Sequence, residues 1–103
     1  MLDEVKISMR ISHNMLDTDI QHDIDACLSD LRRAGIEPYE KDSRGYRKDS
    51  SGDRIIRSDA LIHKAVKLYC KWQCNYQGEG ERYQSNYEDL RDAMSLAGDY
   101  REG

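Results

Sequence analysis

Residues 58–98 contain two amphipathic segments that only four residues separate, and this arrangement limits what the chain can fold into. Apolar side chains in both segments recur every three or four residues, which is the period of a helix with one face in a core. The first set is Leu61, Ala65, Leu68, Trp72 and Tyr76, widened by Ile62, Val66 and Tyr69, and the second is Tyr83, Tyr87, Leu90, Met94 and Ala97. Helices joined by so short a connection pack against each other, so the sequence predicts an antiparallel helical hairpin.

Residues suited to helix ends flank both segments. Ser58 or Asp59 can accept hydrogen bonds from the unpaired amides of the first turn. Gly78 stands where the first helix should stop, and Gly98 stands where a left-handed residue would end the second. These positions support the hairpin and give its approximate limits.

Two further helices are predicted before residue 36. A short first helix is indicated by the spacing of Leu2, Val5 and Met9. It ends near Ile11. The second helix begins at Thr18, which can form a capping box with Gln21, or is capped by Asp17 instead, and it ends at Gly35. Its core-facing residues are Ile20, Ile24, Cys27, Leu28, Leu31 and Ala34.

Residues 36–57 lie between this helical pair and the hairpin and show no helical period. Pro38, Gly45 and Gly52 interrupt the segment. Structureless loops longer than about 15 residues are uncommon in compact domains. The segment is therefore a solvated mobile loop, a loop that contacts a partner, or a loop that holds a short element such as a hairpin near Tyr46.

These patterns predict a single all-α domain over residues 1–98, a small four-helix bundle-like fold with a long polar loop at 36–57. Residues 99–103 would form an extended C-terminal tail. The 103 residues are 38% hydrophobic and 35% charged, which suits exposed helices and leaves little for a deep ligand cavity. A large enzyme pocket is therefore not expected.

Charge is unevenly distributed along the chain. Residues 41–57 hold six basic and three acidic residues, a local charge of +3. Because the whole chain has a net charge of −4, the remaining residues together carry −7. The overall sign argues against binding nucleic acid through phosphate neutralisation. The basic segment and the tail are candidate partner contacts, with the residues Arg44, Tyr46, Arg47, Lys48, Arg54 and Tyr100.

No group of residues predicts catalysis, a cofactor or a metal. His63 and Cys70 would lie about 10 Å apart along a helix, at 1.5 Å per residue, which is too far for one zinc ion. The chain has no GxxxxGK[ST] phosphate loop and no local nucleophile–base pair. Three cysteines without paired spacing fit reduced thiols in the cytosol. The chain has neither a signal-peptide pattern nor a run of about 20 apolar residues, so we expect no membrane partner.

One line of the third predicted helix lies almost opposite its apolar stripe and suggests a contact surface. Small thiols on such a line favour shelter by a neighbouring subunit, although an ordinary solvent face with two chance cysteines is the alternative. The candidate subunit interface consists of His63, Lys67, Cys70, Cys74 and Leu96.

Three sequence patterns resemble a known family. They are the opening LxxVKxxxRI at residues 2–11, the run DxLIxxAxKLYCKxxxxY at 59–76, and the closing SLAGDY at 95–100. With the order of the predicted elements, they resemble the gp6-like phage head-tail connector proteins. The match covers most of the chain.

The resemblance implies a structural role and no enzymatic activity. Copies of the chain would assemble as a ring, commonly of about twelve, through closed heterologous contacts, on the portal protein. The ring would continue the DNA channel toward a tail-completion or stopper protein, and DNA would pass without sequence-specific binding. The protein would occupy the host cytoplasm during assembly and then the head–tail junction of the virion.

Two other functions stay open at the level of sequence. A small helical nucleic-acid-binding regulator would use the basic segment at 41–57 and would show salt-dependent DNA affinity. A helical adaptor would hold one partner helix in a groove. Only the connector should form closed rings.

Overall fold

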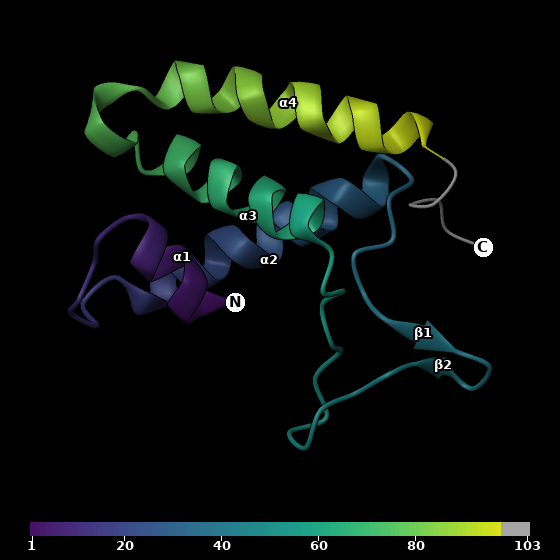
Figure 1. Cartoon of the computed structure of the whole chain (residues 1–103). Coiled ribbons are helices and arrows are strands. Elements are labelled where there is room, and N and C mark those ends of the chain that lie inside the picture. The colour runs from purple at the N-terminus through teal and green to yellow at the C-terminus, as the bar shows by residue number, and fades with distance from the viewer. Residues whose placement is uncertain (98–103) are drawn as a thin grey trace.

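The computed structural model describes residues 1–97 and is mostly helical (Figure 1). Its elements in chain order are α1 (Leu2–Ser8), α2 (Asp17–Arg33), β1 (Lys41–Asp42), β2 (Gly45–Tyr46), α3 (Ala60–Gln73), the 3-10 turn η1 (Tyr76–Gly78) and α4 (Gly80–Leu96). The four predicted helices are present, but the two-stranded sheet corrects the all-α prediction. The predicted helix end at Gly98 and the tail at 99–103 lie outside the described residues.

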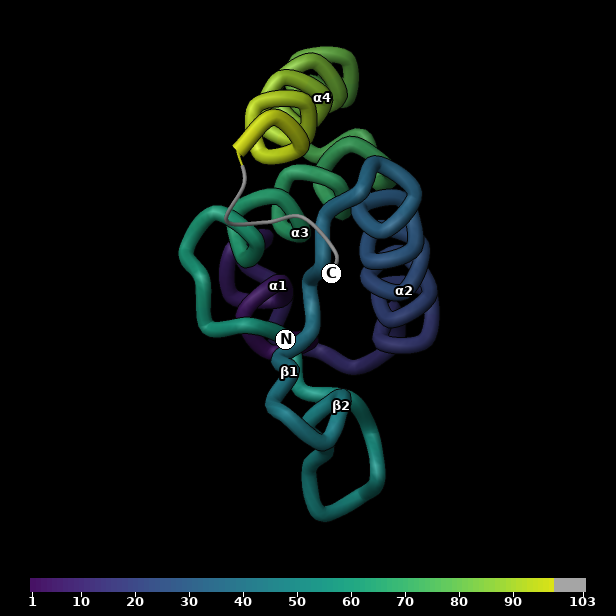
Figure 2. The backbone as a smooth tube through the Cα atoms, turned by 90° about the vertical axis from the view of Figure 1, so that its right-hand side faces the viewer, coloured from purple at the N-terminus to yellow at the C-terminus, as the bar shows by residue number. Residues whose placement is uncertain are grey.

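The helices form layers with α3 in the middle (Figure 2). α4 runs antiparallel to α3 and packs along one side of it, which confirms the predicted hairpin. α1 and α2 contact α3 from the other side and also contact each other. Because α4 packs chiefly against α3, the helices do not form a regular bundle in which each helix has two close neighbours. The molecule is flat, with principal dimensions of 42 × 33 × 19 Å.

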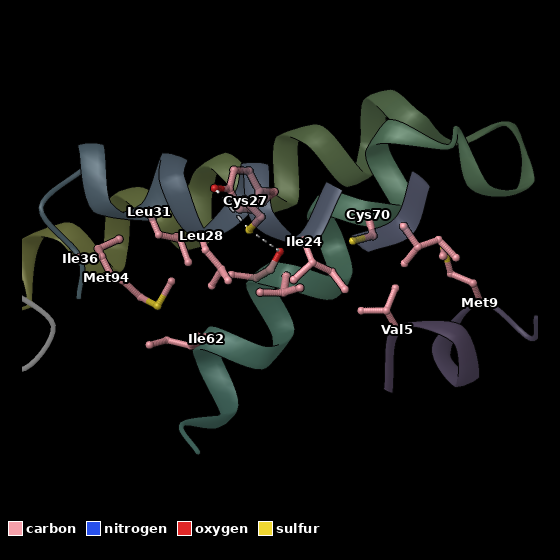
Figure 3. Close-up of a cluster of buried hydrophobic side chains, with 14 residues drawn as sticks. Val5, Met9, Ile24, Cys27, Leu28, Leu31, Ile36, Ile62, Cys70 and Met94 are labelled. Carbon is pink, nitrogen blue, oxygen red and sulfur yellow. Dashed lines mark hydrogen bonds between the residues drawn. The ribbon is translucent and has the colours of Figure 1, made fainter. Parts of the chain in front are cut away.

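One hydrophobic core joins the layers (Figure 3). The predicted inner face of α2 is confirmed, apart from Ala34, which is only partly buried. α1 inserts Val5 and Met9 beside Cys70 (Figure 3). The buried apolar residues are Val5, Met9, Ile20, Ile24, Cys27, Leu28, Leu31, Ile36, Ile62, Ala65, Val66, Cys70, Tyr87 and Met94.

The predicted inner face of α3 is confirmed at Ile62, Ala65 and Val66, which are fully buried. It is wrong at Leu61, which is 41% exposed, while Leu68 and Trp72 are only partly buried. Cys70, which was not predicted to face the core, is also fully buried. A helix between two layers buries an arc wider than one stripe, and its centre faces the larger layer formed by α1 and α2.

Three helix ends differ from the prediction. α3 ends at Gln73 rather than at Gly78, because Asn75 adopts a left-handed backbone (φ 50°). α1 stops at Ser8 rather than near Ile11, because Arg10 adopts a left-handed backbone (φ 56°) and the Ile11 amide closes onto the Lys6 carbonyl at 2.9 Å. α2 has no side-chain cap, so both predicted caps are wrong. The Asp17 carboxylate instead bonds the Lys6 ammonium at 2.8 Å.

Side chains form hydrogen bonds at the start of α3 and in the turn between α3 and α4. Asp59 caps α3 as predicted, accepting bonds from the amides of Leu61 (2.8 Å) and Ile62 (3.3 Å). At the other end, the Asn75 side chain accepts a bond from the Gly80 amide at 2.8 Å. A Cβ at residue 80 would lie 2.7 Å from that Asn75 oxygen and would displace it, so glycine at this position preserves the bond.

Residues 38–57 form an arm that projects from the helical layers (Figures 1 and 2). β1 and β2 pair antiparallel, so of the three alternatives for this segment the structure contains the short hairpin near Tyr46. The pairing continues toward the base, where the Glu40 amide bonds the Ile55 carbonyl and the Arg57 amide bonds the Pro38 carbonyl, both at 2.8 Å. The segment predicted as a long polar loop is therefore an ordered antiparallel excursion.

Tyr87 links α4 to α2 across the central layer. Its ring is fully buried against Tyr69 and Trp72, and its hydroxyl donates to the Asp30 carboxylate at 2.7 Å. Arg91 donates to the same carboxylate at 3.1 Å. Burial alone would raise the pKa of Asp30, but these two donors outweigh it and hold the pKa below its usual value.

We predict that Tyr87→Phe lowers the free energy of unfolding by about 1–3 kcal/mol, because the half-buried Asp30 carboxylate loses one of its two donors. Urea unfolding followed by circular dichroism measures this change. Tyr83→Phe is the matched control, because Tyr83 is a half-buried tyrosine of the same helix whose hydroxyl has no hydrogen-bond partner within residues 1–97. Equal losses in the two variants would contradict the role of this bond.

Candidate functional site

The predicted subunit interface on α3 is largely covered by α1 of the same chain. His63 contacts the Glu4 carboxylate through Nδ1 at 3.0 Å and the Arg57 carbonyl through Nε2 at 3.0 Å. Both partners only accept, so the two bonds coexist in the doubly protonated imidazole. Lys67 also reaches Glu4, at 3.6 Å. These contacts fasten α1 to α3 at its polar edge.

The two cysteines of this predicted interface have different environments. Cys70 is 1% exposed within the core, so the prediction that it faces outward is wrong. The cause is α1, which covers that line of α3 with Val5 and Met9. Cys74 is exposed, with its Sγ 3.6 Å from the sulfur of Met9. A contact between a neighbouring subunit and this face stays a prediction, and Cys70 has no part in it.

Exposed apolar side chains lie at both ends of the helical layers. Leu96, at the last position of α4, is 79% exposed. Ile7 and Met15, at and after the end of α1, are 76% and 85% exposed. The α1–α2 turn and the end of α4 lie at opposite ends of the molecule (Figure 1). Ile7 and Met15 were not singled out from the sequence. Each is an apolar residue that lies outside the predicted core-facing stripes, and this could have marked it as exposed.

The base of the arm is held by a polar and aromatic cluster. Glu37 is 5% exposed and accepts a bond from the Tyr46 hydroxyl at 3.2 Å. The Arg32 guanidinium of α2 donates to that hydroxyl at 3.3 Å. Arg54 lies over the Tyr46 ring at 4.1 Å, and Lys41 lies over it at 4.8 Å. Tyr46, predicted as a partner contact, thus also ties the arm to α2, and Arg54, another predicted contact, packs on its ring.

The other basic residues of the arm face solvent. Arg44 and Lys48 are exposed and have no ion-pair partner in the described part of the chain. Arg47 is bound to Glu40 at 3.1 Å. Contact between these predicted residues and a partner is not tested by a single chain, and Tyr100, the remaining one, lies outside the described residues.

The largely polar hollows of the described structure contain no cluster of metal ligands. The hollow at the base of the arm has a volume of about 540 Å³. Its lining is Glu37, Tyr39, Glu40, Lys41, Arg47, Arg57, Ser58 and Asp59. Within residues 1–97, no three His, Cys, Asp or Glu side chains gather as metal ligands. None of the helices in that range is both long enough and apolar enough to span a bilayer.

The described residues thus form a flat helical domain with exposed apolar ends and a projecting arm. The chain matches the family model described as Phage connector protein over residues 1–101. It therefore belongs to the phage connector protein family, a family of structural virion components. Searches of curated proteins and of solved structures gave no significant match.

Thiol labelling checks the environment of the cysteines. We predict that one thiol per folded chain reacts rapidly, that of Cys74, because Cys27 and Cys70 lie in the core and burial raises the pKa of Cys27 to about 12. Mass spectrometry after brief treatment with an alkylating reagent counts the modified thiols. The Cys74→Ser protein should remain unlabelled until it is unfolded, and rapid labelling at Cys70 would contradict the packing of α1.

The bond from His63 to the Glu4 carboxylate gives α1 a pH-dependent attachment. His63 lowers the pKa of Glu4 below its ordinary value of 4.5, so the carboxylate stabilises the fold above that pH. This contribution is lost as the pH falls below 4.5 and Glu4 takes up a proton. We predict that Glu4→Gln lowers the free energy of unfolding at pH 7 by about 0.5 kcal/mol, as for other exposed ion pairs.

Unfolding measured from pH 7 to pH 3 tests this attachment. The difference between the wild type and Glu4→Gln should shrink below pH 4.5. Asp53→Asn, which changes an exposed carboxylate outside the helices, should match the wild type at every pH. A difference that stays constant with pH would contradict the assignment.

Proposed function

We propose that this chain is the repeating subunit of a ring that sits on the portal protein and extends the DNA channel toward the tail. The observation that carries the proposal is the match to the Phage connector protein family over residues 1–101, nearly the whole chain. A connector of this kind works by geometry, because it must hold two larger assemblies together while leaving a passage open. No catalytic step is needed.

The shape of the molecule supports a ring. A closed ring requires heterologous interfaces, in which two different surfaces of each subunit meet. The domain is 19 Å thin in one direction and carries exposed apolar residues at its two opposite ends. These ends suit contacts with the flanking assemblies, the portal on one side and a tail-completion or stopper protein on the other.

The charge of the chain supports passage of DNA rather than its retention. The net charge is −4, and outside the basic segment at 41–57 it is −7. A surface of that sign repels the phosphate backbone at short range. DNA would slide through the ring without sequence-specific contacts. The subunit would gather in the host cytoplasm and end at the head–tail junction of the virion.

A nucleic-acid-binding regulator has less support. Of the six basic residues in the arm, Arg54 and Lys41 lie against Tyr46, Arg47 is bound to Glu40, and Arg57 donates to the Glu37 carbonyl. Arg44 and Lys48 are left, and two cations supply little of the phosphate neutralisation that non-specific DNA binding needs.

The oligomeric state tests the proposed function. We predict closed rings when the protein is mixed with its portal, and a concentration-dependent equilibrium between monomer and ring without it. Analytical ultracentrifugation gives the mass, and negative-stain electron microscopy shows the ring. A heat-denatured and refolded portal that no longer forms its own ring is the control for the template. A protein that stays monomeric with the intact portal would overturn the proposal.

A further inference from the structure

Unpaired charges of opposite sign gather on two separate parts of the molecule. One part is the arm, and the other is the outer face of α4, which turns away from α3. This outer face consists of Glu81, Ser85, Glu88, Asp89 and Asp92, which line a shallow hollow together with Gln84. Basic side chains predominate in the arm, and acidic side chains predominate on the outer face of α4.

In the arm, basic side chains outnumber acidic ones: residues 41–57 hold six basic and three acidic residues, a net charge of +3. The Asp42 carboxylate accepts a bond from the Arg44 amide at 2.8 Å, and the Asp49 carboxylate accepts one from the Ser51 amide at 2.8 Å. These bonds shape the two turns of the arm. Arg44 lies in the β1–β2 turn and Lys48 lies beside the second turn, and both side chains are exposed.

In α4 the situation is reversed. Arg82 is bound to Glu79 at 3.1 Å, and Arg91 is bound to Asp30 of α2 at 3.1 Å. Arg91 also holds Asp92, at 3.3 Å. The carboxylates of Glu81, Glu88 and Asp89 have no ion-pair partner in the described residues. The helix therefore presents uncompensated negative charge along its outer face.

The two surfaces cannot meet within one molecule. α4 forms one extreme of the molecule and the arm forms the other, with the layers of α3, α2 and α1 between them (Figure 2). The cluster of Glu37, Tyr46 and Arg32 ties the base of the arm to α2. A matching pair of surfaces at opposite extremes of one chain can be satisfied by a second copy, placed head to tail.

We propose that the arm of one subunit docks on the outer face of α4 of the next subunit. This inference rests on the proposed ring and names its side-to-side contact. Arg44 and Lys48 face the carboxylates of Glu81, Glu88 and Asp89, and the contact is heterologous because different surfaces of the two copies meet. Repeated around the ring, each arm finds an acidic helix and each acidic helix receives an arm. The complementary charges fix the order and orientation of the subunits.

Charge reversal on each surface tests the contact. The variants are R44E/K48E in the arm and E81K/D89K on α4, which change exposed residues and leave the core intact. Each variant alone should weaken ring formation by more than about tenfold, because like charges then face each other across the contact. The combined variant, with all four changes, has the charges exchanged between the two surfaces and should form rings again. Ring formation is measured by analytical ultracentrifugation with the portal present.

The control variant R10E/R33E changes the net charge as much as the arm variant does, at exposed positions outside both surfaces. It should form rings like the wild type. Recovery in the combined variant also shows that the single-surface variants fail through charge and not through misfolding. If the wild type forms rings and the two single-surface variants form them equally well, or if the combined variant stays monomeric, the arm contact is overturned while the ring stands. A wild type that forms no ring overturns the proposed function and this contact together.

Discussion

The hydrogen bond from the buried Tyr87 hydroxyl to Asp30 is the constraint on which the arrangement of layers depends. α4 packs chiefly against α3, and Tyr87 passes beside that helix to reach α2. Its ring fills the space between Tyr69 and Trp72 with edge and tilted contacts. A tyrosine side chain can pack against these rings and also bond Asp30, because its ring is apolar and its hydroxyl is polar. The outermost helix is thereby fixed in angle as well as in position, and its outer face keeps a constant relation to the arm.

Local patterns in the sequence predicted the helices well. The period of apolar residues located all four helices, and Asp59 was identified as the cap of α3. The order of packing could not be predicted this way. A stripe on α3 was assigned to the core through Leu61, yet that residue is 41% exposed and Cys70 is buried. The position of α1 decides this, and a period along one helix contains no information about which distant segment will cover it.

The candidate surfaces were predicted less completely than the fold. The basic character of residues 41–57 is visible in the sequence, but the sequence does not show which basic residues pack within the arm and which have no partner there. Arg54 and Tyr46 hold the arm in place, while Arg44 and Lys48 remain exposed. That division depends on a buried glutamate, Glu37, which no local pattern marks as buried. Cross-strand pairing brings these residues together from positions up to 17 apart in the sequence.

The two strands of the arm enter and leave the helical layers side by side, with the Arg57 amide bonded to the Pro38 carbonyl at 2.8 Å. The distance between the end of α2 and the start of α3 is therefore set at the base and does not depend on how far the excursion extends. Residues can be gained, lost or exchanged beyond that base without moving the helices. Natural variation can remodel the reach and charge of the arm while the helical layers stay the same, so related phages could adapt their assemblies through this one segment.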